Sequence, residues 1–253
     1  MVRGLFINLD RMTARRQRIE AEIRRFDLSE AYARLSAIDG KAVVGGVRAG
    51  MAGCFLSHRK AIETARRIGG IVHILEDDAI LSARLKDFLP SPACAAALDR
   101  FDLVFLDMWV LRDEKSVRRY QEALRRAGNG LFFMDLRGAK ISSADSYLVG
   151  PRSVDKVAAL LGAEASLGPR MAVDQFYSRM VAAGRLTAAV VLPFLTCVDI
   201  ETGSRSSIQA MDREEQRRFV MLRTAFFVDR DRQPAFALPP LGGEAASPPP
   251  ADR

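Results

Sequence analysis

The stretch that decides the fold is Ile71-Val72-His73-Ile74-Leu75, followed at once by Glu76-Asp77-Asp78. The first five residues form an apolar run interrupted by one histidine, and Gly69-Gly70 stand before it. A short apolar run bounded by turn residues is typical of a buried strand. The sequence therefore predicts a core strand whose carboxyl end carries three consecutive carboxylates.

Other apolar runs alternate along the chain with segments of helical periodicity. We expect further strands at residues 5–9, 103–106, 131–134, 146–149 and 188–192. We expect helices at residues 12–26, 51–68, 151–161 and 173–183. Asp10 or Thr13 is expected to cap the first of these helices, and Pro151 to begin the third. Strands that alternate with helices predict an α/β fold with a Rossmann-like, mostly parallel sheet flanked by helices.

Four segments have less regular patterns. Residues 37–50 are rich in glycine and predict a loop, and the charged residues 111–130 predict a mobile loop or an insert. Residues 210–227 predict a helix, either packed on the domain or lying as an amphipathic surface on anionic lipid. Residues 234–253 are rich in proline and glycine and predict a disordered tail, which leaves a single domain at residues 1–233.

Composition and charge limit the class of protein. The chain has 253 residues, of which 49% are hydrophobic and 27% charged, and these values exclude a wholly disordered or coiled-coil protein. The net charge of +7 suits a phosphate-bearing ligand, an acidic membrane face or a nucleic acid. The basic residues are spread along the chain without interleaved aromatic residues, so we expect no nucleic-acid partner.

Three cysteines, Cys54, Cys94 and Cys197, are an odd number without C-x-x-C spacing. This pattern predicts neither a disulfide framework nor a zinc ligand set, and it favours a reducing, cytoplasmic compartment. The amino-terminal apolar run is too short for a signal peptide, and no run approaches the length of a membrane span. Any contact with a membrane is expected to be peripheral.

Acidic residues stand at the ends of three predicted strands: Asp10, the triplet Glu76-Asp77-Asp78, and Asp107. Ligands of open α/β sheets bind outside the carboxyl ends of the strands. Adjacent carboxylates repel one another, and oxygen ligands at short spacing suit a hard cation such as magnesium or manganese. The alternative is an exposed acidic turn without a ligand.

His58 shares one helical face with Cys54, Ile62 and Ala65, a pattern more typical of a core histidine than of a ligand. The arginine-rich segment 11–25 follows a strand end, so its first turn is placed to meet a pyrophosphate, although such segments are usually solvated helix faces. The chain has no Walker motif, no G-x-G-x-x-G and no G-x-S-x-G, so neither a P-loop nor a dinucleotide or serine-hydrolase site is indicated.

Five short motifs follow one another within residues 4–210. They are Ile7-Asn8-Leu9-Asp10-Arg11, Gly53-Cys54-Phe55-Leu56-Ser57-His58, Leu75-Glu76-Asp77-Asp78, Ser146-Tyr147-Leu148-Val149-Gly150-Pro151 and Ala172-Val173-Asp174. In this order they resemble glycosyltransferase family 25, the lipopolysaccharide and collagen galactosyltransferase family. The last motif departs from the family's P-V-D because Ala172 replaces proline. Residues 201–208 match the family's late serine-rich segment only loosely, so the sequence does not identify the acceptor.

The resemblance implies a GT-A-type fold and a metal-dependent, inverting transfer of galactose or another hexose from a UDP-sugar. It implies a saccharide or lipid-linked saccharide acceptor in lipopolysaccharide or surface-glycan synthesis, at the cytoplasmic face of the inner membrane. A manganese or magnesium ion is the implied cofactor. The alternative is a non-catalytic module that binds a nucleotide sugar without turnover.

The resemblance also implies roles for individual residues. Asp78, with Glu76 or Asp77 beside it, would hold the metal. The donor would be bound by Asn8, Asp10, Arg11, Arg15, Arg16, Ser57, His58 and Asp77. Asp174 is the predicted catalytic base, with Asp107 and Asp145 as rivals, and a plain helix cap is the alternative role for Asp174.

Overall fold

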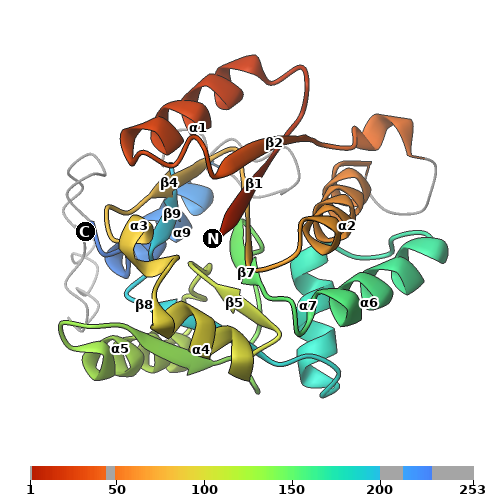
Figure 1. Cartoon of the computed structure of the whole chain (residues 1–253). Coiled ribbons are helices and arrows are strands. Elements are labelled where there is room, and N and C mark those ends of the chain that lie inside the picture. Colours follow the sequence, from red (N-terminus) through yellow and green to blue (C-terminus); the bar gives the residue numbers. More distant parts are fainter. Residues whose placement is uncertain (1, 44–48, 200–212, 230–253) are drawn as a thin grey trace, which may run out of the picture.

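A computed structural model describes residues 2–43, 49–199 and 213–229. Its centre is a seven-stranded sheet in the order β2-β1-β3-β7-β5-β8-β6 (Figure 1). In that order the strands are Tyr32–Ser36, Arg3–Asn8, Val72–Glu76, Ser146–Val149, Leu103–Phe105, Ala188–Leu192 and Phe132–Asp135. Strands β7 and β6 run antiparallel to their neighbours, and the other five share one direction. The predicted α/β class with a mostly parallel sheet is confirmed.

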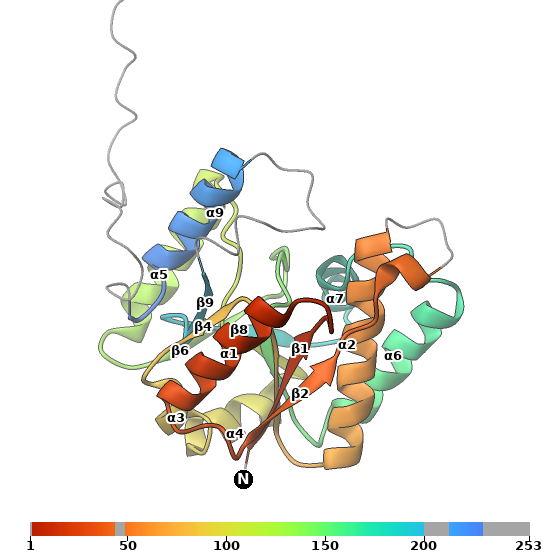
Figure 2. The same cartoon turned by 90° about the horizontal axis from the view of Figure 1, so that it is seen from above.

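Helices cover both faces of this sheet, and alternate residues of each strand point to opposite faces. On one face, Ile74 and Phe105 pack into a core with α2 (Ala49–Ile68), α5 (Glu114–Ala127), α6 (Val154–Ser166) and α7 (Val173–Ala182). On the other face, Leu75 and Val104 pack with α1 (Thr13–Arg25), α3 (Leu85–Phe88) and α4 (Pro92–Arg100). Figure 2 shows α2, α6 and α7 together on one side of the molecule.

A second, two-stranded sheet positions the acidic triplet. Strand β4 (Ala79–Leu81) begins directly after Asp78 and pairs antiparallel with β9 (Thr196–Val198). The backbone N–H of Asp199 donates to the carbonyl of Asp78 at 3.0 Å. The triplet therefore occupies a tight connection between two sheets, where its backbone is held on both sides.

The prediction of a mobile loop or insert at residues 111–130 is wrong, because most of that segment forms α5. Asp113 caps the helix by accepting the N–H of Ser116 at 2.9 Å, and Gly128 ends it at a φ of 53°. Tyr120 and Ala123 bury a narrow apolar face. The many charges obscured this stripe because they occupy the solvent-facing positions.

Two predicted helix starts also differ from the structure. Met12 stands at the N-cap of α1 without a side-chain hydrogen bond, and Thr13 is the first helical residue. The Asp10 carboxylate accepts hydrogen bonds from the side chains of Arg34 and Ser36 instead of capping the helix. The third predicted helix begins at Val154 rather than at Pro151, with Ser153 at its N-cap.

The carboxyl-terminal helix α9 (Arg213–Ala225) packs on the domain. Val220, Phe226 and Phe227 are buried, and Phe219 stacks on Trp109 with ring centroids 5.3 Å apart. This favours packing over the lipid-facing alternative for the described part of residues 210–227. The loosely matching segment 201–208 and the predicted tail at residues 234–253 lie outside the described residues.

Candidate functional site

Two pockets meet at the carboxyl end of β3. The first, of about 250 Å³, lies between the ends of β1 and β3, α2 and the short helix η1 (Gly40–Ala42). The second, of about 200 Å³, lies between α2, the start of α7 and the segment before β7. Cys54 and Glu76 line both pockets. The two cavities therefore share a wall, and Glu76 is its carboxylate.

The first pocket depends on a close approach of α2 to the loop before it. A Cβ added at Gly53 would lie 2.6 Å from the Gly40 nitrogen and 2.7 Å from the Ile38 carbonyl oxygen. Ser57 stabilises this contact between α2 and the loop. Its hydroxyl accepts a hydrogen bond from the Ile38 N–H at 2.8 Å and donates one to the Gly53 carbonyl at 2.6 Å. Ser57, a predicted donor-binding residue, lines the first pocket, and its hydroxyl is already used in this contact between α2 and the loop.

Arg15 reaches across the acidic triplet from α1. Its guanidinium lies 3.0 Å from Asp77 Oδ1 and 2.6 Å from Asp78 Oδ2. Asn8 donates to Asp77 Oδ2 at 2.7 Å. Burial raises the pKa of Asp77, although Arg15 and Asn8 favour its ionised form. Part of the negative charge that suggested a metal is therefore balanced by this arginine.

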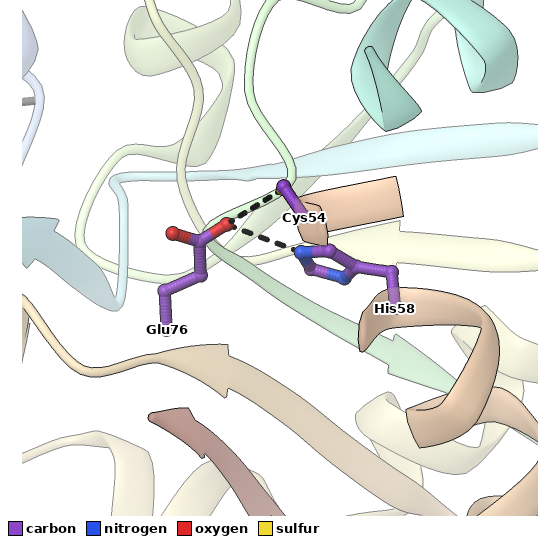
Figure 3. A group of neighbouring side chains, drawn as sticks. All are labelled: Cys54, His58 and Glu76. Carbon is purple, nitrogen blue, oxygen red and sulfur yellow. Dashed lines mark hydrogen bonds and ion pairs between the residues drawn. The ribbon is translucent and has the colours of Figure 1, made fainter. Parts of the chain in front are cut away.

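Glu76 faces the other way, toward α2. Its Oε1 lies 3.1 Å from His58 Nε2 and 3.7 Å from Cys54 Sγ (Figure 3). His58 Nδ1 contacts the hydroxyl of Tyr147 at 3.1 Å, and that hydroxyl lies 3.3 Å from the hydroxyl of Tyr177. Burial opposes the ionisation of Glu76, but the hydrogen bond from His58 and the positive charge of Arg15 outweigh it and lower the pKa of Glu76. His58 is fully buried, as its apolar face predicted, and it also lines the first pocket.

Four carboxylates line the second pocket: Glu76 at the end of β3, Asp78 in the turn after it, Asp145 just before β7, and Asp174 on α7. Burial raises the pKa of Asp78 to about 8, and the negative charges of Asp145 and Glu76 add to this against Arg15. Asp78 Oδ1 is buried and has no hydrogen-bond partner among the described residues. Proton or cation binding at this oxygen would relieve the repulsion.

Asp174 is the second residue of α7, and Ala172 is the N-cap. Its Oδ1 accepts the backbone N–H of Gln175 at 2.8 Å. Burial raises the pKa of Asp174, and the nearby charges of Asp145 and Glu76 raise it further. The carboxylate is therefore a better proton acceptor than an exposed aspartate, and Asp174 lines the second pocket.

Asp107, the second predicted catalytic residue, has a different environment. It is 1% exposed and lines neither pocket. The guanidinium of Arg223, itself fully buried, lies 2.5 Å from Asp107 Oδ2 and 2.7 Å from Asp145 Oδ2. Thr196 also donates to Asp107 at 2.9 Å. This arrangement makes Asp107 part of a buried ion pair that anchors α9 beside the second pocket.

Sequence reasoning missed Arg223. It is fully buried on α9, three residues after the buried Val220 and three before the buried Phe226, which follows the end of the helix. A single arginine between apolar residues is a detectable signal, but its partners at Asp107 and Asp145 are 116 and 78 residues away in the sequence.

Three predicted donor residues lie outside both pockets. Asn8 is buried, and its side-chain amide donates hydrogen bonds to Asp77 and to the Met12 carbonyl. Asp10 is exposed and pairs with Arg34, and Arg16 pairs with Glu20 at 2.8 Å on the solvent face of α1. Arg11, by contrast, lines the first pocket beside Asp39, with which it forms an ion pair. Arg15 and Asp77 line the same pocket.

Comparisons with known proteins give a distant result. No protein-family model and no curated protein matches the chain. Among solved structures, the chain is similar to the galactosyltransferase LgtC in complex with donor and acceptor sugar analogues, with a TM-score of 0.39 and 11% identity. The match covers 75% of this chain and 73% of that one. At this distance it carries no argument about the roles of residues.

Within residues 2–43, 49–199 and 213–229, no helix has the length and apolar character needed to cross a membrane.

Proposed function

We propose that this chain is a glycosyltransferase that moves a hexose from a UDP-sugar to a saccharide acceptor. The observation that carries the proposal is the meeting of two pockets at Glu76: three cations and three carboxylates line the first, and among the described residues carboxylates without a cation line the second. Arg11, Arg15 and Lys41 line the first, as a diphosphate would require. Four carboxylates line the second, where a sugar hydroxyl must lose a proton.

The reaction assigned to this geometry is a single inverting displacement. The acceptor hydroxyl in the second pocket forms a bond to the anomeric carbon, while the bond from that carbon to the diphosphate oxygen breaks. Asp174 takes the hydroxyl proton, and the cationic residues of the first pocket stabilise the departing UDP. The raised pKa of Asp174 suits this role because a base works best when its pKa approaches the working pH.

The metal proposal rests on Asp78. Its unpartnered, buried Oδ1 and its raised pKa fit a hard divalent cation such as manganese or magnesium. Asp78 would hold the ion, with Oε2 of Glu76, the oxygen that does not contact His58, as the neighbouring ligand. The ion would act as a Lewis acid toward the leaving diphosphate. Arg15 already contacts Asp78 Oδ2, so it shares the task of neutralising charge.

The proposed acceptor is a saccharide or lipid-linked saccharide of lipopolysaccharide or another surface glycan. This part rests on the resemblance of five sequence motifs to family 25. The same resemblance supports work at the inner face of a membrane through a peripheral contact.

The deciding experiment measures UDP release from UDP-galactose and other UDP-hexoses, with manganese and a panel of saccharide acceptors. Thermal unfolding is followed with the same nucleotides, because a ligand that binds the native state raises the Tm. We expect a rise in Tm with one UDP-sugar and UDP release that depends on the acceptor. A rise in Tm without release would instead assign a non-catalytic nucleotide-sugar-binding module, and no response to any UDP-sugar would contradict both functions.

A further inference from the structure

Cys54, His58 and Glu76 form a compact group on the wall shared by the two pockets (Figure 3). Cys54 and His58 are four residues apart on α2, so they lie on the same face of the helix. Glu76, the last residue of β3, faces them from the sheet. One sulfur, one nitrogen and one oxygen atom of these side chains all lie within 4.8 Å of one another.

We propose that this group is a binding site for a divalent transition-metal ion of the zinc class. The three protein ligands are Cys54 Sγ, His58 Nε2 and Glu76 Oε1. Zinc bonds of about 2.3 Å to sulfur and about 2.0 Å to nitrogen and oxygen, at tetrahedral angles, place ligand atoms about 3.3–3.6 Å apart. The measured separations from Glu76 Oε1 are 3.7 Å to the sulfur and 3.1 Å to the nitrogen. Small side-chain movements would complete the coordination.

The surroundings of His58 support metal binding. A histidine that binds a metal usually has its other ring nitrogen held by a hydrogen bond, which fixes the orientation of the ring. His58 Nδ1 contacts the Tyr147 hydroxyl at 3.1 Å, and the two rings stack with centroids 5.7 Å apart. Tyr147 is fully buried and is itself held by Tyr177. The imidazole is therefore already directed toward the group.

All three ligand residues line the first pocket, so a fourth ligand would reach the ion from that cavity. Three protein ligands and one open position are the pattern of a zinc site that binds water or a substrate atom, rather than that of a closed structural site. A water molecule or a phosphate oxygen is the expected fourth ligand. The thiol and imidazole distinguish this site from the all-oxygen position at Asp78, which suits harder cations.

Metal binding here requires a defined transfer of protons. The thiol of Cys54 releases its proton to solvent as the metal–sulfur bond forms, since the thiolate is the ligand. The proton between His58 Nε2 and Glu76 moves to Nδ1, where the Tyr147 oxygen accepts it. The imidazole stays neutral, and the chain loses one proton for each metal ion bound.

The test uses the full chain, free of metal and of nucleotide, titrated with Co²⁺ and then with Zn²⁺. We expect the near-ultraviolet absorption of a thiolate–cobalt bond to correspond to one Co²⁺ per chain, separately from any Co²⁺ at Asp78, and we expect Zn²⁺ to displace that signal. Cys54→Ser should abolish the absorption and weaken zinc binding by at least about 100-fold, because loss of an outer contact alone costs 10–100-fold. Tyr147→Phe tests that outer contact and should weaken binding by about tenfold.

The matched control is Cys94→Ser, since Cys94 is a buried cysteine on α4 outside the group. It should keep the absorption, and circular dichroism should show that each variant is folded. A folded wild-type chain without the absorption would overturn the proposal, as would an absorption that survives Cys54→Ser. The measurement uses neither donor nor acceptor, so its failure is separate from failure of the transferase proposal.

Discussion

The two pockets share Cys54 and Glu76 but differ in charge. Among the described residues, Arg11, Arg15 and Lys41 line the first pocket beside three carboxylates, whereas the second is lined by carboxylates without a cation. The difference arises within the acidic triplet itself. Asp77 lines the first pocket and Asp78 the second, although both lie in the turn between β3 and β4 and both contact Arg15. Three adjacent carboxylates thus form a boundary between two environments instead of one cluster.

Replacing the predicted base should have the largest effect on this contrast. Asp174→Asn retains the shape and the contact with the Gln175 N–H but cannot accept a proton. We expect transfer to slow by roughly 10²–10⁴-fold, with unchanged donor affinity and Tm. Asp155→Asn, at an exposed aspartate in the first turn of α6, is the control. Transfer at the wild-type rate in Asp174→Asn would assign the base to Asp145 or Asp107.

Removing Arg223 should destabilise the domain on the side of the second pocket. Arg223→Met leaves Asp107 buried without its cation, and breaking a buried pair in this way costs about 3–5 kcal/mol. Denaturant unfolding measures the loss. Arg218→Ala on the same helix removes an exposed pair with Glu214 and should change the free energy of unfolding by less than about 1 kcal/mol. Equal losses in the two variants would show that the Arg223 pair does not anchor α9.

The substitution Asp78→Asn should affect the rate of transfer and the pH dependence of the free energy of unfolding, which can be measured separately. We expect metal-supported transfer to fall by about 100-fold or more, since a metal contributes several kcal/mol of charge stabilisation. Because the folded pKa of Asp78, about 8, lies above the ordinary aspartate pKa of 3.8, its contribution to stability is full below pH 4 and is lost as the pH rises toward 8. The variant should lack this fall. Chemical unfolding at several pH values measures it, and an unaltered pH profile would argue against a buried, repelled Asp78.

The smallest effect tests the basic side of the comparison. Arg11→Ala removes one cation from the first pocket and should weaken UDP-sugar binding by about tenfold, the equivalent of about 1.5 kcal/mol for a charged hydrogen bond. Arg16→Ala is the matched control, because Arg16 pairs with Glu20 away from both pockets. Isothermal titration compares the two. Similar weakening in both variants would place the donor along the solvent face of α1.

Much of the secondary structure follows from the sequence because apolar periodicity reports burial. The run before Glu76 forms β3, and the segments predicted at residues 51–68 and 173–183 form α2 and α7. The direction of β7 and the helix α5 could not be obtained in this way. A four-residue apolar run has no sign of strand direction, and the dense charges of α5 conceal a narrow apolar stripe.

By itself, the sequence determined an α/β sheet with carboxylates at the end of a buried strand, because strand length, burial and turn residues are local properties. The tertiary structure decided which groups meet. Tertiary packing placed Asp77 in the first pocket and Asp78 in the second, and it paired Arg223 with Asp107. It also brought Cys54 and His58 close to Glu76, although the cysteine spacing predicted no zinc ligand set. These contacts join residues 18 to 116 positions apart, and their distances depend on how helices pack on the sheet, which local patterns do not encode.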